Sequence, residues 1–312
     1  MKKIKKLGAV LLASVFMIST VACGSTESGG TDSTDTQKIS AEERLADSQK
    51  KMADVESVHM SMDMNIGMNI QTEDAKEQEV NMNTTSEIDM FQNPLKMKMA
   101  MTMDLGDLLG AEAEDLEGID TNQTMEMYMD EVDGKAMMYM TMFGQWLKQE
   151  MDLSELTQYD TEEMTKLYTD GLSDVKEVGT EEINGETTTK IEGVINGDSV
   201  QKILAASGME DYMTEASGLD QETLDQLLSE ITDFKMAIWL NEDNYMVKVE
   251  EDLTEMINVM MENMLEGTED AGSVTYTAFK MIATYSKFNQ VEDFTIPEEA
   301  KNAEDISGTI TE

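Results

Sequence analysis

The chain has 312 residues, of which 65 are acidic and 22 are basic, and its formal net charge is −43 at pH 7. Such a negative field repels phosphate backbones, so the composition argues against nucleic-acid binding. A single cysteine cannot form an internal disulfide, so an exported protein of this length depends on core packing for its stability.

The first 22 residues have the pattern of a signal peptide. Lysines within Met1–Lys6 precede the apolar run Leu7–Val21, which ends in small residues. That run is shorter than the roughly 20 apolar residues that span a bilayer, and polar residues follow it. We therefore predict that residues 1–22 direct export and are then removed. Four lysines and no acids are lost with them, so the formal net charge of −43 becomes −47.

The only cysteine, Cys23, follows in the sequence STVACGS, which resembles a bacterial lipobox. The resemblance implies that the bond before Cys23 is cut and that its thiol carries diacylglycerol. The predicted partner is therefore the cell membrane, where Cys23 anchors the chain on the outer, extracytoplasmic face. Residues 23–39 are rich in Gly, Ser, Thr and Asp and are predicted to be a flexible linker. Residues 40–312 are predicted to form a single domain.

The first elements of that domain are a helix and a long strand. Ser40 and Glu43 have the spacing of a capping box, so a helix is expected to begin at Ser40. The strand follows in the segment HMSMDMNIGMNI, where every second residue is apolar. Alternation of this kind gives one apolar sheet face, here formed mostly by methionine. Its members include Met60, Met62, Met64, Ile66 and Met68.

Two hairpins continue the same alternation. If Phe91–Pro94 forms the first turn, Met90 lies opposite Leu95, Ile88 opposite Met97 and Met82 opposite Met103. A second turn at Asp133-Gly134 places Met129 opposite Met138, Met127 opposite Met140 and Met125 opposite Met142. The methionines of neighbouring strands are therefore predicted to meet on one face. Those on the third strand are Met97, Met99, Met101 and Met103.

The rest of the chain mixes helices with strands. Helical spacing is expected at 152–168, 199–207, 220–229 and 256–264, and a long strand at 274–288. Hairpin turns are expected at Asn184-Gly185 and at 241–244. The predicted fold class is α+β, with about ten antiparallel strands and four or five helices, because the β-α-β rhythm of a parallel sheet is missing.

This order of elements resembles the bacterial lipoprotein-carrier fold of periplasmic lipoprotein carriers and mycobacterial lipid-handling lipoproteins. The resemblance rests on VESVHMSMDM after the first helix, the hairpin VGTEEINGETTTKIEGVI, the pair MAIWLNEDNYMVKVEED and the closing segment FNQVEDFTIPEEA. It implies a curved half-barrel sheet with helices on its concave face and an apolar cavity. More closely, the chain resembles uncharacterised Gram-positive lipoproteins of that fold.

Four roles are open for the methionines, and one of them, protection against oxidants through methionine sulfoxide, leaves no distinguishing spacing. They can form an ordinary core, in which each buried side chain contributes on the order of 1.5 to 3 kcal/mol. They can line a cavity for acyl chains, since methionine is unbranched, polarizable and able to repack. They can bind Cu(I), although the repeats are too long for one ion and His59, on the opposite face, is the only histidine. The cavity candidates are Met60, Met62, Met64, Ile66, Met68, Met97, Met99, Met101, Met103, Met127 and Met140.

No catalytic motif, metal-ligand cluster or cofactor loop is present in the sequence, so we expect neither an enzyme nor a cofactor. The favoured hypothesis is a membrane-anchored lipoprotein that binds or shuttles an apolar or amphiphilic ligand. The alternative is a cell-surface interaction or sensing module whose half-barrel is fully packed. A concave face filled by the helices expected at 40–56 and 152–170 would favour that alternative.

Overall fold

The computed structural model describes most of the chain from residue 39 onward. Its residues fall into two compact units, one drawn from Met1–Asp54 and Tyr159–Glu269 and the other from Val55–Gln158 and Asp270–Glu312. We call them unit 1 and unit 2 and describe each by itself. The described residues are 39–71, 77–104, 122–132, 134–142, 144–151, 167, 171–206, 228–229, 231–265 and 273–306.

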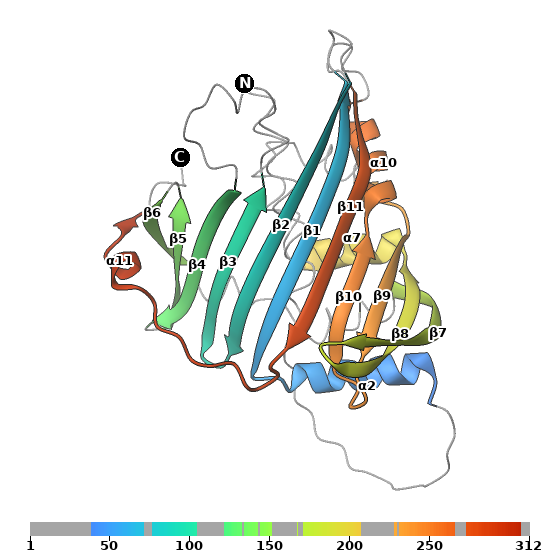
Figure 1. Cartoon of the computed structure of the whole chain (residues 1–312), viewed down its shortest axis with the longest axis horizontal. Helices are drawn as coiled ribbons and strands as arrows, with labels where there is room; N and C mark the ends of the chain where they lie inside the picture. Colours follow the sequence, from blue (N-terminus) through green and yellow to red (C-terminus); the bar gives the residue numbers. More distant parts are fainter. Residues whose placement is uncertain are drawn as a thin grey trace, which may run out of the picture. The chain divides into compact units, whose positions relative to one another are not determined.

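Unit 2 is an open, twisted sheet whose described strands run in the order β12-β6-β5-β4-β3-β2-β1-β11 (Figure 1). Neighbouring strands are antiparallel except for β12, which pairs with β6 in parallel. The strands are β1 (Ser57–Gln71), β2 (Glu77–Gln92), β3 (Leu95–Asp104), β4 (Asn122–Val132), β5 (Lys135–Met142), β6 (Gln145–Met151), β11 (Ser273–Ser286) and β12 (Glu304–Asp305). The short helix α11 (Glu298–Lys301) precedes β12.

Unit 1 contains four strands in the order β10-β9-β8-β7 and three described helices. The strands are β7 (Leu172–Ile183), β8 (Glu186–Ile195), β9 (Phe234–Leu240) and β10 (Met246–Asp252). The helices are α2 (Ala41–Ala53), α7 (Gly197–Ala206) and α10 (Thr254–Leu265). They correspond to the helices expected at the start of the domain, at 199–207 and at 256–264. The helices expected at 152–168 and 220–229 fall almost entirely outside the described residues.

The described chain is mostly sheet, with twelve strands in place of the ten that the sequence predicted. The two strands that sequence reasoning missed are β6 and β12. In β6 the apolar Trp146 and Leu147 are adjacent and so point to opposite faces, which hides the two-residue period. β12 has two residues and no pattern of its own. The position of helices on a concave face stays a prediction.

The predicted capping box at the start of α2 is confirmed. The Ser40 hydroxyl accepts from the Glu43 backbone N–H at 3.2 Å, and the Glu43 carboxylate accepts from the Ser40 backbone N–H at 3.0 Å. Two otherwise unpaired donors at the helix N-terminus are thereby satisfied. The helix buries Leu45 and Met52, which lie seven residues apart on one stripe.

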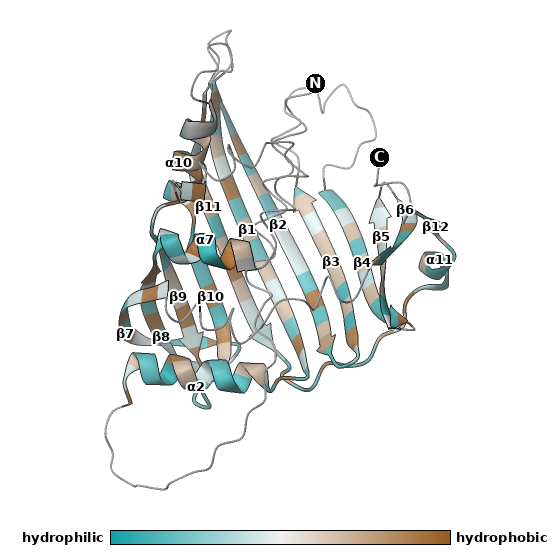
Figure 2. Ribbon diagram, turned by 180° about the vertical axis from the view of Figure 1, so that it is seen from behind, coloured by the Kyte–Doolittle hydropathy of each residue, from teal (hydrophilic) through white to brown (hydrophobic). Residues whose placement is uncertain are grey.

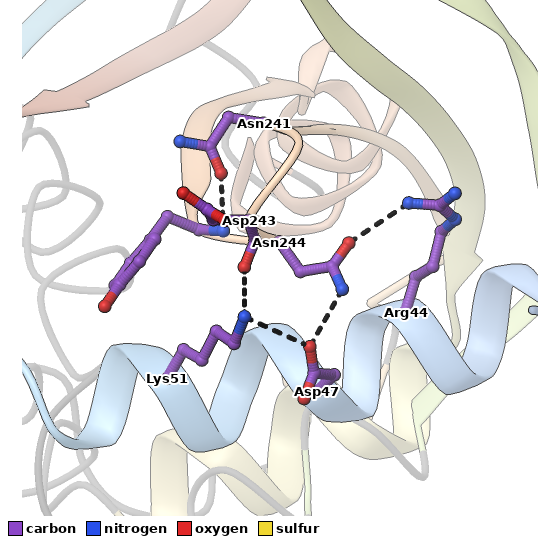
Figure 3. A network of polar contacts seen from close by, with 7 residues as sticks. Arg44, Asp47, Lys51, Asn241, Asp243 and Asn244 are labelled. Atoms are coloured by element: carbon purple, nitrogen blue, oxygen red, sulfur yellow. Dashed lines mark hydrogen bonds and ion pairs between the residues drawn. The ribbon is translucent and has the colours of Figure 1, made fainter. Parts of the chain in front are cut away.

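A polar network holds α2 to the turn between β9 and β10, within unit 1 (Figure 3). The Arg44 guanidinium donates to the side-chain oxygen of Asn244 at 3.1 Å, and the Asn244 amide donates to Asp47 at 2.8 Å. Lys51 forms an ion pair with Asp47 at 3.6 Å and donates to the carbonyl oxygen of Asp243. Because several of these bonds involve a charged partner, the network fixes the helix more firmly than neutral bonds would.

The hairpin registers follow the turn residues. Asn184 and Gly185 both have positive φ, at 54° and 82°, as a tight two-residue turn requires, and Ile183 pairs with Glu186. The turn predicted at Asp133-Gly134 is confirmed, because Met129 pairs with Met138 and Met127 with Met140.

The register predicted for the β2–β3 hairpin is wrong by two residues. Strand pairing continues to Gln92 and Leu95, so the turn is shorter than Phe91–Pro94. Met90 therefore pairs with Met97 and Ile88 with Met99, in place of Leu95 and Met97. Since side chains alternate with a period of two, this shift leaves the same residues on the same face.

One carboxyl group lies in the apolar core of unit 1. Along β10, Val247, Val249 and Glu251 share the buried face, and each is 5% exposed. Glu251 pairs across the ladder with the buried Met236. Burial in these surroundings disfavours the charged form and raises the pKa of Glu251 to about 7. The group is therefore largely protonated in mildly acidic solution.

The stability of the protein should depend on pH through Glu251. The folded chain keeps this proton up to about pH 7, whereas the unfolded chain loses it near the ordinary value of 4.5. The free energy of unfolding therefore falls as the pH rises between these values, by about 3 kcal/mol at about 1.4 kcal/mol per pKa unit. Glu251→Gln cannot titrate, so at about pH 8 it should be more stable than the parent by about that amount.

Urea denaturation of the parent and the Glu251→Gln variant at acidic and alkaline pH measures this difference. Well below pH 4.5 both side chains are neutral in the folded and the unfolded state, so the two proteins should have similar stability there. A stability difference that does not change with pH would contradict the burial of this carboxyl group.

Candidate functional site

Methionines of neighbouring strands stand side by side in rows across unit 2. One row joins Met90, Met97, Met129 and Met138 from β2 to β5. The next joins Ile88, Met99, Met127 and Met140. A third pairs Met101 with Met125, and β1 adds Met60, Met62 and Met64. We call the sheet face that carries these residues the methionine face.

Burial of the methionine face changes from one side of unit 2 to the other. On β1 the five predicted candidates are fully buried, at 2–6% exposed; they are Met60, Met62, Met64, Ile66 and Met68. On β3, β4 and β5 the methionines whose burial the structure describes are half-buried, except Met101, which is buried at 8% exposed. The half-buried predicted candidates are Met97, Met99, Met103, Met127 and Met140. The β1 side is therefore packed core, and the β3–β5 side retains accessible apolar surface.

Charge is separated from this face by the two-residue period of the strands. Side chains two positions apart on a strand lie on the same face, so each strand has one set of alternate positions on the methionine face; we call this set its parity. Among the described residues of β1 to β6, the only charged side chain with this parity is Glu131, beside the β4–β5 turn. The charged residues of these strands otherwise take the opposite parity, and Figure 2 shows polar and apolar bands alternating along the strands. They include Asp63, Glu87, Asp89, Lys96, Lys98, Glu126, Asp130, Lys148 and Glu150.

His59 lies on that opposite face, as predicted, but it is not an isolated surface histidine. Its Nδ1 lies 2.7 Å from Asp89 Oδ1 and its Nε2 lies 3.0 Å from Glu87 Oε2. The imidazole side chain is 21% exposed. Both acidic partners come from β2, the strand next to β1, so the contact is a local cross-strand interaction.

An aromatic cluster closes the opposite face over β4, β5 and β6. The buried Tyr128 and Tyr139 pack with Ile296 and Ala300 of the C-terminal segment. The ring of Phe294 lies 6.0 Å from that of Tyr128. Sequence reasoning missed this cluster, although Tyr128 and Tyr139 are cross-strand partners at polar-face positions, which is a signal of a second packed surface.

Lysine 96 ties the same C-terminal segment to β3. Its ammonium group pairs with Asp293, donates to the Phe294 carbonyl at 2.6 Å and lies 4.5 Å from the centre of the Phe294 ring. The hydrogen bond from Lys96 holds the pKa of Asp293 below its usual value. Because the C-terminal segment covers the opposite face here, the methionine face is the more accessible apolar surface of β3 to β5.

Two hydroxyls interrupt the methionine face at its centre. Thr84 and Ser86 of β2 share the parity of Met82 and Ile88, and they are 6% and 3% exposed. Among the described residues, the buried side-chain polar atoms without a hydrogen-bond partner are Arg44 Nε and Thr232 Oγ1, so neither of these two hydroxyls is a buried group without a partner. Sequence reasoning passed over them, although their even numbers place them on this face.

The remaining predictions concern the lipid anchor, metal ligands and membrane-spanning helices. Cys23 and residues 1–38 fall outside the described residues. Within the described ranges, no three His, Cys, Asp or Glu side chains come close enough together to hold a metal ion. No helix among these residues is long and apolar enough to cross a bilayer.

The described chain is thus mostly one open, largely antiparallel sheet with few helices and with a methionine-lined face in unit 2. The chain belongs to the family of unknown function DUF6612, which matches residues 40–305. None of the curated proteins matches the chain.

Three solved structures are similar to the chain, with low sequence identity. The lipoprotein LppX of Mycobacterium tuberculosis is 15% identical, over 82% of this chain and 98% of that one, with a TM-score of 0.39. LprF from Mycobacterium bovis is 13% identical, over 83% and 97%, with a TM-score of 0.40. A domain assigned to outer membrane lipoprotein sorting from Vibrio parahaemolyticus is 9% identical, over 84% and 98%, with a TM-score of 0.23. LppX and LprF, together with the lipoprotein-sorting domain, are structures of the kind that the resemblance in the sequence named.

The two sides of the methionine face should respond differently to the same truncation. Met62→Ala removes a fully buried side chain on β1 and should cost about 2 to 5 kcal/mol of unfolding free energy. Met127→Ala removes a half-buried side chain on β4 and should cost about 1 kcal/mol or less. Urea denaturation of both variants measures the difference. Equal losses would contradict an accessible β3–β5 side.

Proposed function

We propose that this protein is a membrane-anchored extracytoplasmic lipoprotein that binds an apolar or amphiphilic ligand on its methionine face. The observation that carries the proposal is the half-buried, uncharged apolar surface formed by the methionines of β3, β4 and β5. Apolar surface that stays accessible is costly to leave in water, and a contiguous patch of it on a soluble protein marks an interaction or ligand site.

The choice of methionine supports binding over simple packing. Three rotatable bonds and a polarizable sulfur let a methionine surface adjust to ligands of differing shape. Each CH₂ group of an acyl chain that is removed from water on such a surface contributes about 0.8 kcal/mol. Charged groups would oppose this transfer, and the described β1 to β6 keep all of them except Glu131, beside the β4–β5 turn, on the other face.

The membrane anchor belongs to the same proposal. An apolar ligand has low solubility in water, so its binding protein gains access to it by staying at a membrane surface. In our account the diacylglyceryl group on Cys23 holds the domain there, and residues 24–39 act as a flexible linker. The proposed activity is binding or shuttling and involves no chemical conversion of the ligand.

The alternative is an interaction or sensing module with a fully packed core. The complete burial of Met60, Met62 and Met64 on β1 favours it, because that part of the face is ordinary core. The half-buried methionines of β3 to β5 favour the binding proposal. The two hypotheses therefore differ over the second group of residues, and an experiment on β4 distinguishes them.

Uptake of a neutral fluorescent probe, N-phenyl-1-naphthylamine, by the chain from residue 24 onward tests the proposal. Met127→Asp places an unpaired carboxylate on the methionine face and should weaken probe binding about tenfold or more. Thr124→Asp adds the same charge to the same strand, but at an exposed position on the opposite face, and should leave binding unchanged.

Urea denaturation confirms that both variants remain folded before binding is compared. A parent protein that does not bind the probe, or equal binding by the parent and Met127→Asp, would contradict the proposal. Loss of binding in both variants would show a general effect of added charge and would not support a site on this face.

A further inference from the structure

The described methionines on this face of unit 2 form two groups that differ in burial. On β1 and the neighbouring β11 they are enclosed, at 0–6% exposed; they are Met60, Met62, Met64, Met68 and Met281. On β3, β4 and β5 two rows are half-buried, so their side chains keep surface that solvent reaches. We call these six residues the accessible rows; they are Met97, Met99, Met127, Met129, Met138 and Met140. A solute that attacks thioethers therefore reaches the accessible rows before the enclosed group.

The thioether is the group that distinguishes these side chains from leucine. Leucine has a similar volume and would also form an apolar face, but it has no sulfur atom. A methionine sulfur donates a lone pair to one oxygen of hydrogen peroxide. A sulfur–oxygen bond forms as the oxygen–oxygen bond breaks, and a proton moves to the departing oxygen, which leaves as water. Sulfur loses two electrons, the peroxide gains them, and the product is the polar methionine sulfoxide.

Two properties of the sequence direct a peroxide to these thioethers. Thiolates are stronger nucleophiles than thioethers, but Cys23 is the only cysteine, and its thiol is blocked in the proposed lipoprotein. The chain from residue 24 onward contains no thiol. Hydrogen peroxide is uncharged, so the net charge of −43 does not repel it as it would repel an anionic oxidant. An uncharged peroxide is therefore the class of oxidant that suits this protein.

We propose that the accessible rows are modification sites for peroxides, and that their conversion to sulfoxide switches off ligand binding on the methionine face. This inference rests on the proposed function, because it concerns the surface that binds the apolar ligand. An acyl chain would have to desolvate each sulfoxide oxygen, so every modified residue weakens binding. The enclosed methionines keep their thioethers, and the core of unit 2 stays packed.

The modification is reversible. Methionine sulfoxide reductases return the sulfoxide to the thioether; two thiols are oxidised to a disulfide and water is released. Binding lost through oxidation of the accessible rows is therefore regained on reduction, whereas binding lost through unfolding is not.

Limited treatment with hydrogen peroxide, followed by peptide mass spectrometry, locates the modified residues. The protein is the chain from residue 24 onward, which contains every residue that the structure describes, and it is treated once folded and once in concentrated urea. In the folded protein the accessible rows should gain oxygen about tenfold faster than the methionines of β1. In urea the two groups should react at similar rates, because the protection of β1 comes from the fold.

Binding of N-phenyl-1-naphthylamine is measured before the treatment and again after catalase has removed the peroxide. The parent should lose affinity about tenfold or more, and sulfoxide reductases with dithiothreitol should restore it. The readout is the ratio of the two affinities within each protein, so a variant with a different starting affinity can still be compared.

Leucine substitutions assign the effect to particular sulfur atoms and nearly conserve volume. The test variant carries Met97→Leu, Met99→Leu, Met127→Leu, Met129→Leu, Met138→Leu and Met140→Leu. Its affinity ratio should be close to one. The control variant carries Met60→Leu, Met62→Leu and Met64→Leu, and its ratio should equal that of the parent. The site map of the parent requires no substitution, so it tests the inference even where a variant does not fold.

Three results would overturn the inference and leave the proposed function intact. The first is oxidation of the β1 methionines as fast as the accessible rows in the folded protein. The second is unchanged probe binding by a parent whose accessible rows are fully oxidised. The third is an equal loss of affinity in the parent and the test variant. A parent that does not bind the probe before treatment would instead remove the proposed function, and the proposed switch with it.

Discussion

Separation of charged from apolar side chains by the two-residue period of the strands is the constraint on which unit 2 depends. In a chain with 65 acidic residues, any charged side chain among the methionines would be costly to bury. Among the described residues of β1 to β6, strand alternation places these charges on one face, apart from Glu131, and the methionines on the other, apart from Met137. The β2–β3 turn preserves this arrangement even with a register other than the predicted one, because the shift is by two residues. The result is an apolar sheet face on a strongly acidic protein, with Glu131 as the only charged residue of the described β1 to β6 on that face.

The same face serves two purposes on different strands. On β1 the side chains are enclosed and contribute to stability as any core does. From β3 to β5 they are half-buried, while the C-terminal segment closes the opposite face with Tyr128, Tyr139 and Ile296. In our proposal, the methionine face is the surface that remains for a ligand. Thr84 and Ser86 lie between these two regions and give the surface a polar position.

Much of the fold could be predicted from local signals, and the failures have physical reasons. The capping box at Ser40 and the Asp133-Gly134 turn act through neighbouring residues, so the sequence predicts them directly. The face of each methionine follows from parity alone. The β2–β3 register depends on where pairing stops, and β6 and β12 depend on contacts distant in sequence. The aromatic cluster and the hydroxyl pair were missed because the prediction followed only the alternation of aliphatic residues and methionines. Tyr128 and Tyr139 lie on the polar face, and Thr84 and Ser86 are polar residues on the apolar face.

Native mass spectrometry tests the central claim most directly. The chain from residue 24 onward would be expressed with a cleavable export signal in a bacterial host and purified without detergent, with Met127→Asp prepared in parallel. The account predicts a reproducible adduct of lipid mass on the parent that solvent extraction removes and that Met127→Asp lacks. A parent mass equal to that of the polypeptide alone, unchanged after incubation with membrane lipids, would contradict the account.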